Sequence, residues 1–140
     1  MVKNILITGG AGYIGSHISE ILIKKNKNIF LIDNLSTGHR KLIHKKAKFF
    51  KIDISDEKKI SNIIKKNDID SIIHLAANLI IGEGQKNPKK YYKNNVDGTK
   101  KLLKACKGKN VKNIIFSSTA AIYKEGQYQV TENSKIKTKS

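Results

Sequence analysis

Three glycines near the N-terminus have a spacing that suits phosphate binding. Gly9, Gly12 and Gly15 follow a short apolar run and precede a helical pattern. In such a turn the first glycine lets the chain leave a strand tightly, the second lets a phosphate approach the backbone, and the third lets the helix pack closely on the sheet. The free N–H groups at the helix start favour a pyrophosphate. The pattern therefore predicts a dinucleotide site, with a purely structural turn as the alternative.

A carboxylate follows where a dinucleotide-binding turn needs one. Asp33 ends the second predicted strand, about 20 residues beyond the glycines. A carboxylate at this place can accept hydrogen bonds from both ribose hydroxyls and would repel a 2′-phosphate. Asp33 therefore favours NAD over NADP as the cofactor.

Alternating strands and helices must position these residues. Unbroken apolar runs predict buried strands, and amphipathic runs predict helices. The predicted strands cover residues 3–8, 28–33, 47–52, 70–76 and 113–117. The predicted helices cover residues 13–26, a segment capped by Ser55, and a segment opened by Asn87 and Pro88. This alternation predicts an α/β fold, a doubly wound parallel sheet with right-handed crossovers.

Helical spacing also predicts which residues of each helix face the sheet. The predicted inner residues are Ile14, Ile18, Ile21, Leu22 and Lys25 in the first helix, Ile60, Ile63 and Ile64 in the second, and Tyr92, Val96, Thr99, Leu103 and Cys106 in the third. From residue 124 onward no apolar periodicity remains, so we expect a polar tail that buries little.

Length and composition limit the classes of protein that fit. The 140 residues suit one domain, and the net charge is +17. Arg40 is the only arginine and the lysines are dispersed, whereas base and phosphate recognition favours arginine forks. We therefore expect no specific nucleic-acid partner, and a lysine-rich nucleic-acid binder is kept as the alternative.

The remaining composition argues against other sites. The single cysteine excludes an internal disulfide and a cysteine-rich zinc site, and we expect no metal. No apolar run approaches the roughly 18 residues of a membrane span, so we expect no membrane partner. The apolar run at the N-terminus is too short for a signal peptide, which predicts a cytoplasmic location.

Six motifs, in order along nearly the whole chain, carry a family resemblance. They are residues 8–17, 33–38, 53–54, 74–77, 91–99 and 116–123. Together they resemble the N-terminal part of the extended short-chain dehydrogenase/reductase family, and within it the UDP-glucose 4-epimerases. The resemblance implies a Rossmann-type NAD-binding fold, interconversion of UDP-glucose and UDP-galactose through a 4-keto intermediate, a UDP-sugar substrate and a homodimer.

The resemblance also implies roles for individual residues. Cofactor contacts are implied for Gly9, Gly12, Tyr13, Ile14 and Gly15 at the pyrophosphate, Asp33, Asn34, Leu35, Ser36, Thr37 and Gly38 at the adenosine ribose, Asp53 and Ile54 at the adenine, and Leu75, Ala76, Ala77 and Asn94 along the rest of NAD. Thr119 matches the catalytic Ser/Thr, whose hydroxyl can donate and accept a hydrogen bond at the sugar 4-oxygen.

Three positions distinguish this chain from members of the family. Ala120 and Ala121 stand where related 4,6-dehydratases carry an Asp-Glu pair, which favours an epimerase. Leu79 stands where many epimerases carry a lysine after the fourth strand, so a contact to the cofactor or to substrate phosphate is in question.

The general base of the family, the tyrosine of a Tyr-x-x-x-Lys pair, is not in this sequence. None of the five tyrosines has lysine four positions later. In the family the pair would fall just beyond Ser140, so the resemblance implies that residues 1–140 are a truncated NAD-binding domain with no substrate domain. We expect the chain alone to be inactive and its sheet to expose apolar surface on one face. The alternatives are a non-catalytic dinucleotide-binding module and an epimerase or dehydratase acting on another nucleotide sugar.

Several candidate residues have a structural interpretation instead. Asp53 could cap a helix, and His74 is interpreted as an ordinary buried strand residue. His17 is interpreted as a helix surface or packing residue. Cys106 is interpreted as a small core residue.

Overall fold

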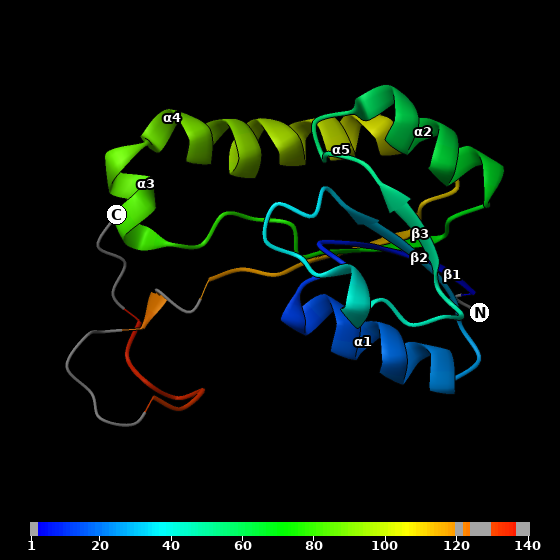
Figure 1. Cartoon of the computed structure of the whole chain (residues 1–140), viewed down its shortest axis with the longest axis horizontal. Helices are drawn as coiled ribbons and strands as arrows, with labels where there is room; N and C mark the ends of the chain where they lie inside the picture. The colour runs from blue at the N-terminus through cyan, green and yellow to red at the C-terminus, as the bar shows by residue number, and fades with distance from the viewer. Residues whose placement is uncertain (1–2, 120–121, 124–129, 137–140) are drawn as a thin grey trace.

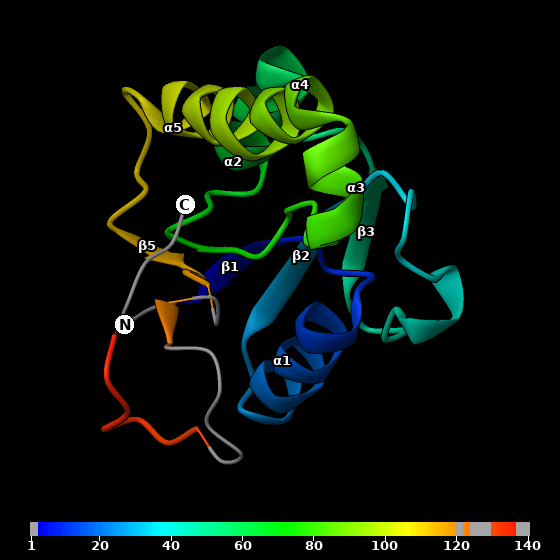
Figure 2. The same cartoon turned by 90° about the vertical axis from the view of Figure 1, so that its left-hand side faces the viewer.

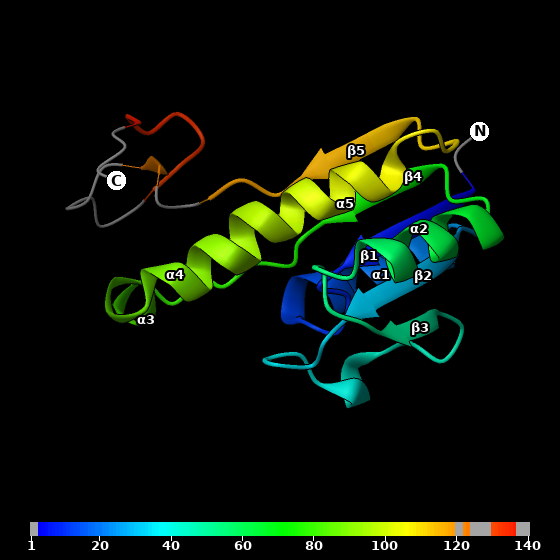
Figure 3. The ribbon, with the colours of Figure 1, turned by 90° about the horizontal axis from the view of Figure 1, so that it is seen from above.

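Five parallel strands form one sheet in the order β3-β2-β1-β4-β5 (Figure 3). The computed structural model describes residues 3–119, 122–123 and 130–136. The strands are β1 (Asn4–Thr8), β2 (Asn28–Asp33), β3 (Lys48–Lys51), β4 (Ser71–His74) and β5 (Asn113–Phe116). The helices are α1 (Tyr13–Lys24), η1 (Arg40–Leu42), α2 (Glu57–Lys66), α3 (Ile81–Lys86), α4 (Pro88–Tyr91), η2 (Tyr92–Gly98) and α5 (Thr99–Cys106). The prediction of a doubly wound parallel sheet is confirmed.

Helices cover both faces of the sheet, and each face has its own apolar cluster (Figure 1). On one face α1 packs over Ile5, Ile7 and Leu31, with Ile18 and Leu22 against them. On the other face α2 and α5 lie over the cluster that contains Leu6, Ile32 and Ile72. Alternate residues of each central strand thus enter opposite clusters, which explains their unbroken apolar sequence.

The strand order reverses at β1, which pairs with both β2 and β4. Thr8, the last residue of β1, is in register with Ile32 on one side and with His74 on the other. In doubly wound sheets ligands bind beyond the carboxyl ends of the strands at this reversal. The glycine turn and the segment after β4 both begin there.

The inner face of α1 differs from the predicted one. Ile14 and Ile21 are 55% and 54% exposed, whereas Gly15 and Ser19 are buried. The buried stripe keeps helical spacing but is centred on small residues, because the helix must approach the glycine turn closely at Gly15. Apolar periodicity could not reveal a face built partly from glycine and serine.

The predicted inner stripe of the last helix is also wrong in part. Tyr92 and Leu103 are 57% and 50% exposed, whereas Leu102 and Ala105 are buried. The seven residues of η2 form a π-helix between α4 and α5. A π-helix pairs residues i and i+5 rather than i and i+4, so it shifts the register between the two α-helical parts.

Helix caps agree with the prediction at one helix and correct it at another. Asn87 caps α4 by accepting from Lys90 N, and Pro88 is the first helical residue, as expected. At α2 the cap is Asp56, whose carboxylate accepts from Lys59 N, and not Ser55. The side chain of Asp53 accepts from the backbone N–H of Ser55, just before this helix.

β5 is exposed, whereas its apolar run predicted a buried strand with apolar surface exposed on at most one face of the sheet. Ile114, Ile115 and Phe116 are 41%, 61% and 61% exposed. Side chains alternate along a strand, so these residues expose apolar surface on both faces of the sheet rather than on one. β5 pairs only with β4 and lies at the edge of the sheet (Figure 2).

The described residues after β5 contain little regular structure. Tyr123 forms an isolated antiparallel bridge with Ile136, and Val130 and Ile136 are exposed, in agreement with the expected tail. The predictions for Ala120 and Ala121 lie outside the described residues, as does most of the tail's first part. Among the helices that the structure describes, none has the length and apolar character to cross a membrane.

Candidate functional site

The glycine turn joins β1 to α1 and allows two backbone approaches that side chains would block. Gly9 has a φ of +71°, and a Cβ on it would lie 2.9 Å from Ala76 N. A Cβ on Gly15 would lie 2.4 Å from Gly9 O and 2.8 Å from Gly10 Cα. Gly9 thus has the left-handed backbone that a tight strand exit needs, and Gly15 lets the start of the helix approach the turn closely.

The N-terminus of α1 is suited to an anion. Gly12 is the N-cap residue and has no side chain to occupy the N–H groups of the first turn. Tyr13 and Ile14, the first two helical residues, are 76% and 55% exposed. The helix dipole adds a partial positive charge at this point. The geometry thus presents free donors where the sequence predicted a pyrophosphate.

Asp33 holds the glycine turn and the following loop together. Its Oδ2 accepts from Ala11 N at 3.0 Å, and its Oδ1 accepts from Leu35 N at 2.8 Å. The side chain is only 9% exposed, and Gly38 approaches it so closely that a Cβ there would lie 2.9 Å from Oδ1. A carboxylate has about four acceptor positions, so acceptor capacity remains for a ribose. This anchoring role was not predicted from the sequence.

The ribose loop and the predicted adenine segment are tied to each other. Asn34 Nδ2 donates to Asp53 Oδ2 at 2.8 Å, and Asp53 Oδ1 accepts from Ser55 N. Burial acts to raise the pKa of Asp53, but hydrogen bonds from Ser55 and Asn34 and the charge of Lys93 outweigh it and lower the pKa. The side chain of Ile54 is buried in the core, which leaves its main chain for a ligand.

The segment after β4 is held by an asparagine of the π-helix. Asn95 Oδ1 accepts from Asn78 N at 2.8 Å, and Asn95 Nδ2 donates to Asn78 O at 3.0 Å. Asn94 Nδ2 in turn donates to Asn95 Oδ1 at 2.9 Å. Sequence analysis selected Asn94 and missed Asn95, although a half-buried amide beside an inner helix face always needs partners.

Asn95→Ala is expected to weaken NAD binding about tenfold, because a lost hydrogen-bond partner costs about 1–3 kcal/mol when the remaining groups stay buried. The segment that lines the predicted cofactor site would lose both bonds that fix Asn78. Titration calorimetry with NAD measures the effect. Asn62→Ala, on the exposed side of α2, is the matched control and should bind as the wild type does. Equal affinities of the two variants would contradict the prediction.

Thr119 and Leu79 lie on the segments that follow β5 and β4. Ser117 N donates to His74 O, which continues the pairing of these strands to their carboxyl ends. Thr119 is exposed two residues later. It follows β5 at the carboxyl end of the sheet, where Leu75, Ala76 and Ala77 follow β4. Leu79 is 76% exposed. The topology thus brings the candidate catalytic hydroxyl to the edge that carries the glycine turn.

Three other candidates have the structural roles that were favoured for them. His17 lies on the helix surface, where its Nδ1 contacts Tyr13 O at 2.8 Å. Cys106 is half-buried against the core, and burial raises the pKa of its thiol. His74 is 3% exposed, with partners on both ring nitrogens. No three His, Cys, Asp or Glu side chains gather as a possible metal site within the described part of the chain.

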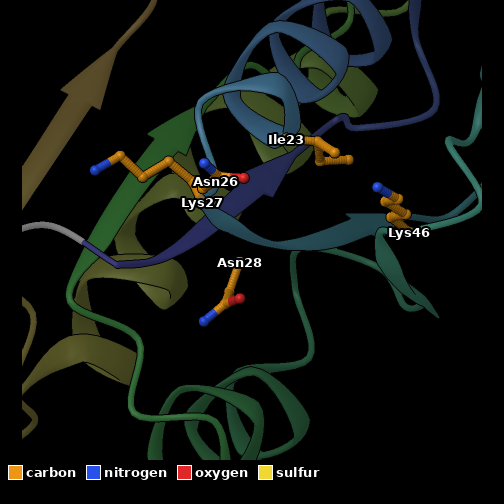
Figure 4. A pocket seen from close by; sticks show the side chains of 5 residues that line it. All are labelled: Ile23, Asn26, Lys27, Asn28 and Lys46. Atoms are coloured by element: carbon orange, nitrogen blue, oxygen red, sulfur yellow. The ribbon is translucent and has the colours of Figure 1, made fainter.

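A surface hollow lies at the amino-terminal end of the strands, opposite the end that carries the glycine turn; Figure 4 shows the residues that line it. Its volume is about 330 Å³, and its lining comes from the end of α1, the start of β2 and the turn before β3. The lining residues are Ile23, Asn26, Lys27, Asn28 and Lys46. The hollow is on the amino-terminal side of β2, so it does not belong to the site at the strand reversal.

Comparisons with known proteins agree with this geometry. The chain is 46% identical over 119 residues to the UDP-glucose 4-epimerase of Lactobacillus helveticus, a match that covers 85% of this chain and 36% of that protein. The crystal structure of the Brucella ovis UDP-glucose 4-epimerase in complex with NAD superposes with a TM-score of 0.85 at 36% identity, over 98% of this chain and 42% of that one. The UDP-Glc/GlcNAc 4-epimerase of Campylobacter jejuni gives a TM-score of 0.83 at 39% identity, over 97% of this chain and 43% of that one.

These three relatives are much longer than this chain, which spans about a third of the L. helveticus protein. Nearly the whole chain nevertheless matches one family. The model of the NAD dependent epimerase/dehydratase family matches residues 5–140, which include the glycine turn, Asp33, Asn94 and Thr119. From this match and the identity to the epimerases, the chain belongs to the NAD dependent epimerase/dehydratase family.

Proposed function

We propose that this chain is the NAD-binding portion of a UDP-glucose 4-epimerase. The observation that carries the proposal is the position of Asp33, whose buried carboxylate joins the glycine turn to the loop after β2. This arrangement leaves an acceptor beside an uncapped helix N-terminus, which is the combination that a ribose and a pyrophosphate need. The names of the L. helveticus and B. ovis relatives support the same activity.

The residues at the strand reversal fit NAD. In the proposal the turn from Gly9 to Gly15, with Tyr13 and Ile14, binds the pyrophosphate. The loop Asn34–Gly38 and Asp33 bind the adenosine ribose, and Asp53 and Ile54 lie at the adenine. Leu75, Ala76, Ala77 and Asn94 line the remainder of the cofactor. The chemistry supplied by NAD is acceptance of a hydride from the sugar C4 and its return to the opposite face.

Thr119 is proposed as the residue that orients the substrate hydroxyl. Its own hydroxyl can accept a hydrogen bond from the 4-hydroxyl of the sugar, or donate one to the 4-oxygen once this has become a ketone. It cannot hold the proton that leaves this hydroxyl, because an aliphatic alcohol is a very weak base at neutral pH. In the proposal these residues supply cofactor binding and orientation, and the proton acceptor of the family, the tyrosine of a Tyr-x-x-x-Lys pair, is not among them.

Two alternatives remain as outcomes of the tests. A sugar other than glucose is supported by the C. jejuni relative, whose name includes GlcNAc. A non-catalytic dinucleotide-binding module would bind NAD but would gain no activity when the rest of an epimerase is supplied. A homodimer, a cytoplasmic location and the lack of a nucleic-acid or membrane partner stay predictions from the sequence.

Asp33→Asn is expected to reduce the preference for NAD over NADP by about 10-fold or more, since hydrogen bonds to charged groups contribute about 1.5–3 kcal/mol. Asparagine keeps an acceptor for only one of the Ala11 and Leu35 amides, its NH2 group faces the other, and it no longer repels a 2′-phosphate. Calorimetric titration with both cofactors gives the ratio of dissociation constants. Asp68→Asn, an exposed carboxylate before β4, is the charge-matched control. Tighter binding of NADP than NAD by the wild type would refute the assignment of the cofactor.

A further inference from the structure

His74, the last residue of β4, is buried between two hydroxyl groups from different elements. Its Nδ1 is 2.7 Å from Thr8 Oγ1 of β1, and its Nε2 is 2.8 Å from Thr99 Oγ1 of α5. The imidazole is 3% exposed, and the ring of Phe116 on β5 packs against it with centroids 5.5 Å apart. The side chains in contact with it on β1, α5 and β5 are therefore all uncharged.

The other partners of these hydroxyls decide the direction of each hydrogen bond. Thr99 Oγ1 donates to Asn95 O at 2.7 Å, so it must accept from Nε2–H of His74. Thr8 Oγ1 accepts from the N–H groups of Leu75 and Ala76, both at 3.3 Å, and uses its own proton toward Nδ1. One form of the imidazole satisfies every group, namely the neutral ring protonated at Nε2.

A charged imidazole does not fit the same set of bonds. Protonation at Nδ1 would turn this atom into a third donor aimed at Thr8 Oγ1, and the hydroxyl proton would lose its acceptor. Burial independently lowers the pKa of His74. Geometry and burial thus agree on the neutral ring.

The hydrogen bonds of His74 connect both ends of the segment 75–78. At the start of the segment, Thr8 Oγ1 holds the N–H groups of Leu75 and Ala76. At its end, the side chain of Asn95 holds both backbone polar groups of Asn78. His74 joins Thr8 to Thr99, and Thr99 is bonded to the main chain of Asn95. A movement of α5 relative to β1 would therefore have to break this chain of bonds.

We propose that His74 is a positioning residue that, as the neutral Nε2-protonated ring, fixes the segment 75–78 between β1 and the π-helix in the shape that receives NAD. The segment lies against the glycine turn, where the backbone of Ala76 fills the space that a Cβ on Gly9 would need. His74 acts on the segment through its hydrogen bonds to Thr8 and Thr99. The cofactor part of the inference rests on the proposed function.

The first test is spectroscopic and needs no cofactor. Long-range ¹H–¹⁵N spectra of the full chain report the tautomer of each of the four histidines, and His74→Asn identifies the signals of His74. We expect the neutral Nε2-protonated pattern for His74, and burial should retain it below the usual titration range of a histidine. An Nδ1-protonated ring, or a ring that becomes charged within that usual range, would overturn the inference.

The second test uses Thr99, which lies on the far side of His74 from the segment. Thr99→Val removes the acceptor for Nε2–H with little change of shape, whereas Thr99→Ser keeps it. We expect faster amide exchange at Ala76 and Asn78 and about tenfold weaker NAD binding in Thr99→Val. In Thr99→Ser the exchange rates at Ala76 and Asn78 and the NAD affinity should be close to those of the wild type. Exchange at Leu6, in the centre of β1, should stay unchanged in both variants. Thr131→Val, at an exposed position, is the control for a threonine-to-valine change.

The outcomes separate this inference from the proposed function. Uniformly faster exchange across the sheet in Thr99→Val, with no rescue by serine, would mean that the bonds serve general stability and would overturn the positioning role. Failure of the wild type to bind NAD would overturn the proposed function and the cofactor part of the inference. The tautomer and the exchange rates would then still decide whether His74 holds the segment.

Discussion

The 140-residue chain is expected to show no interconversion of UDP-galactose and UDP-glucose in the presence of NAD. General acid–base catalysis contributes about 10²–10⁴ to the rate, and no tyrosine of the chain has the required lysine one helical turn away. Positioning of the sugar is a further large part of the barrier reduction, and these residues supply only one side of such a site. Turnover is measured by the formation of UDP-glucose from UDP-galactose.

Supplying the C-terminal part of a relative tests whether the inactive chain can take part in an epimerase. Adding the remaining C-terminal part of a relative, such as the L. helveticus epimerase, should produce activity if the proposed function is right. In the complemented mixture Thr119→Val should lower turnover by about 10²-fold through loss of orientation, whereas Ser118→Ala, on the neighbouring hydroxyl, should have little effect. Turnover by the chain alone that is abolished in Thr119→Val would show that the chain carries its own base.

Gly15→Ala is expected to destabilise the fold by about 3 kcal/mol and to abolish measurable NAD binding, because overpacking a tight contact costs about 1–3 kcal/mol and occasionally more. The new Cβ would lie 2.4 Å from Gly9 O and 2.8 Å from Gly10 Cα. Both contacts are to backbone, so no side chain can move away to relieve them. The helix start would have to shift, and with it the donors that face the pyrophosphate.

Gly82→Ala is the matched control for this substitution. Gly82 also lies in a helix, α3, but a Cβ on it meets nothing within 4 Å. Its replacement should be neutral or stabilising by up to about 1 kcal/mol from helix propensity alone. Urea unfolding compares the two variants, and calorimetry compares their NAD affinities. Comparable stability of the two variants would show that the close approach at Gly15 is not required.

The central strands and the glycine turn could be predicted because their signals are local. An unbroken apolar run such as Ile5–Ile7 is typical of a strand buried on both faces, and Gly9 and Asp33 stand at strand ends that any doubly wound sheet brings together. These features depend on neighbours in sequence and on general rules of topology. The predicted position of the site therefore rests on local sequence signals and on general rules of topology.

The features that were missed depend on contacts between distant segments. The π-helix Tyr92–Gly98 has no side-chain pattern of its own, so the change of register that buries Leu102 instead of Leu103 was invisible. The bond pair between Asn95 and Asn78 depends on the path of the loop after β4. The anchoring of Ala11 by Asp33 likewise exists only once both loops have folded.

The exposed edge strand β5 makes self-association of the chain depend on its net charge. Ile114, Ile115 and Phe116 expose apolar side chains on a strand that has no neighbour on its outer side among the described strands, and such an edge is a template for strand addition between molecules. At a net charge of +17, two such molecules repel each other over roughly a Debye length, about 10 Å at 0.1 M salt. Added salt shortens the range of this repulsion but does not weaken the attraction between the apolar side chains of β5. The lysines thus protect this edge in dilute buffer, and the protection fades as the ionic strength rises.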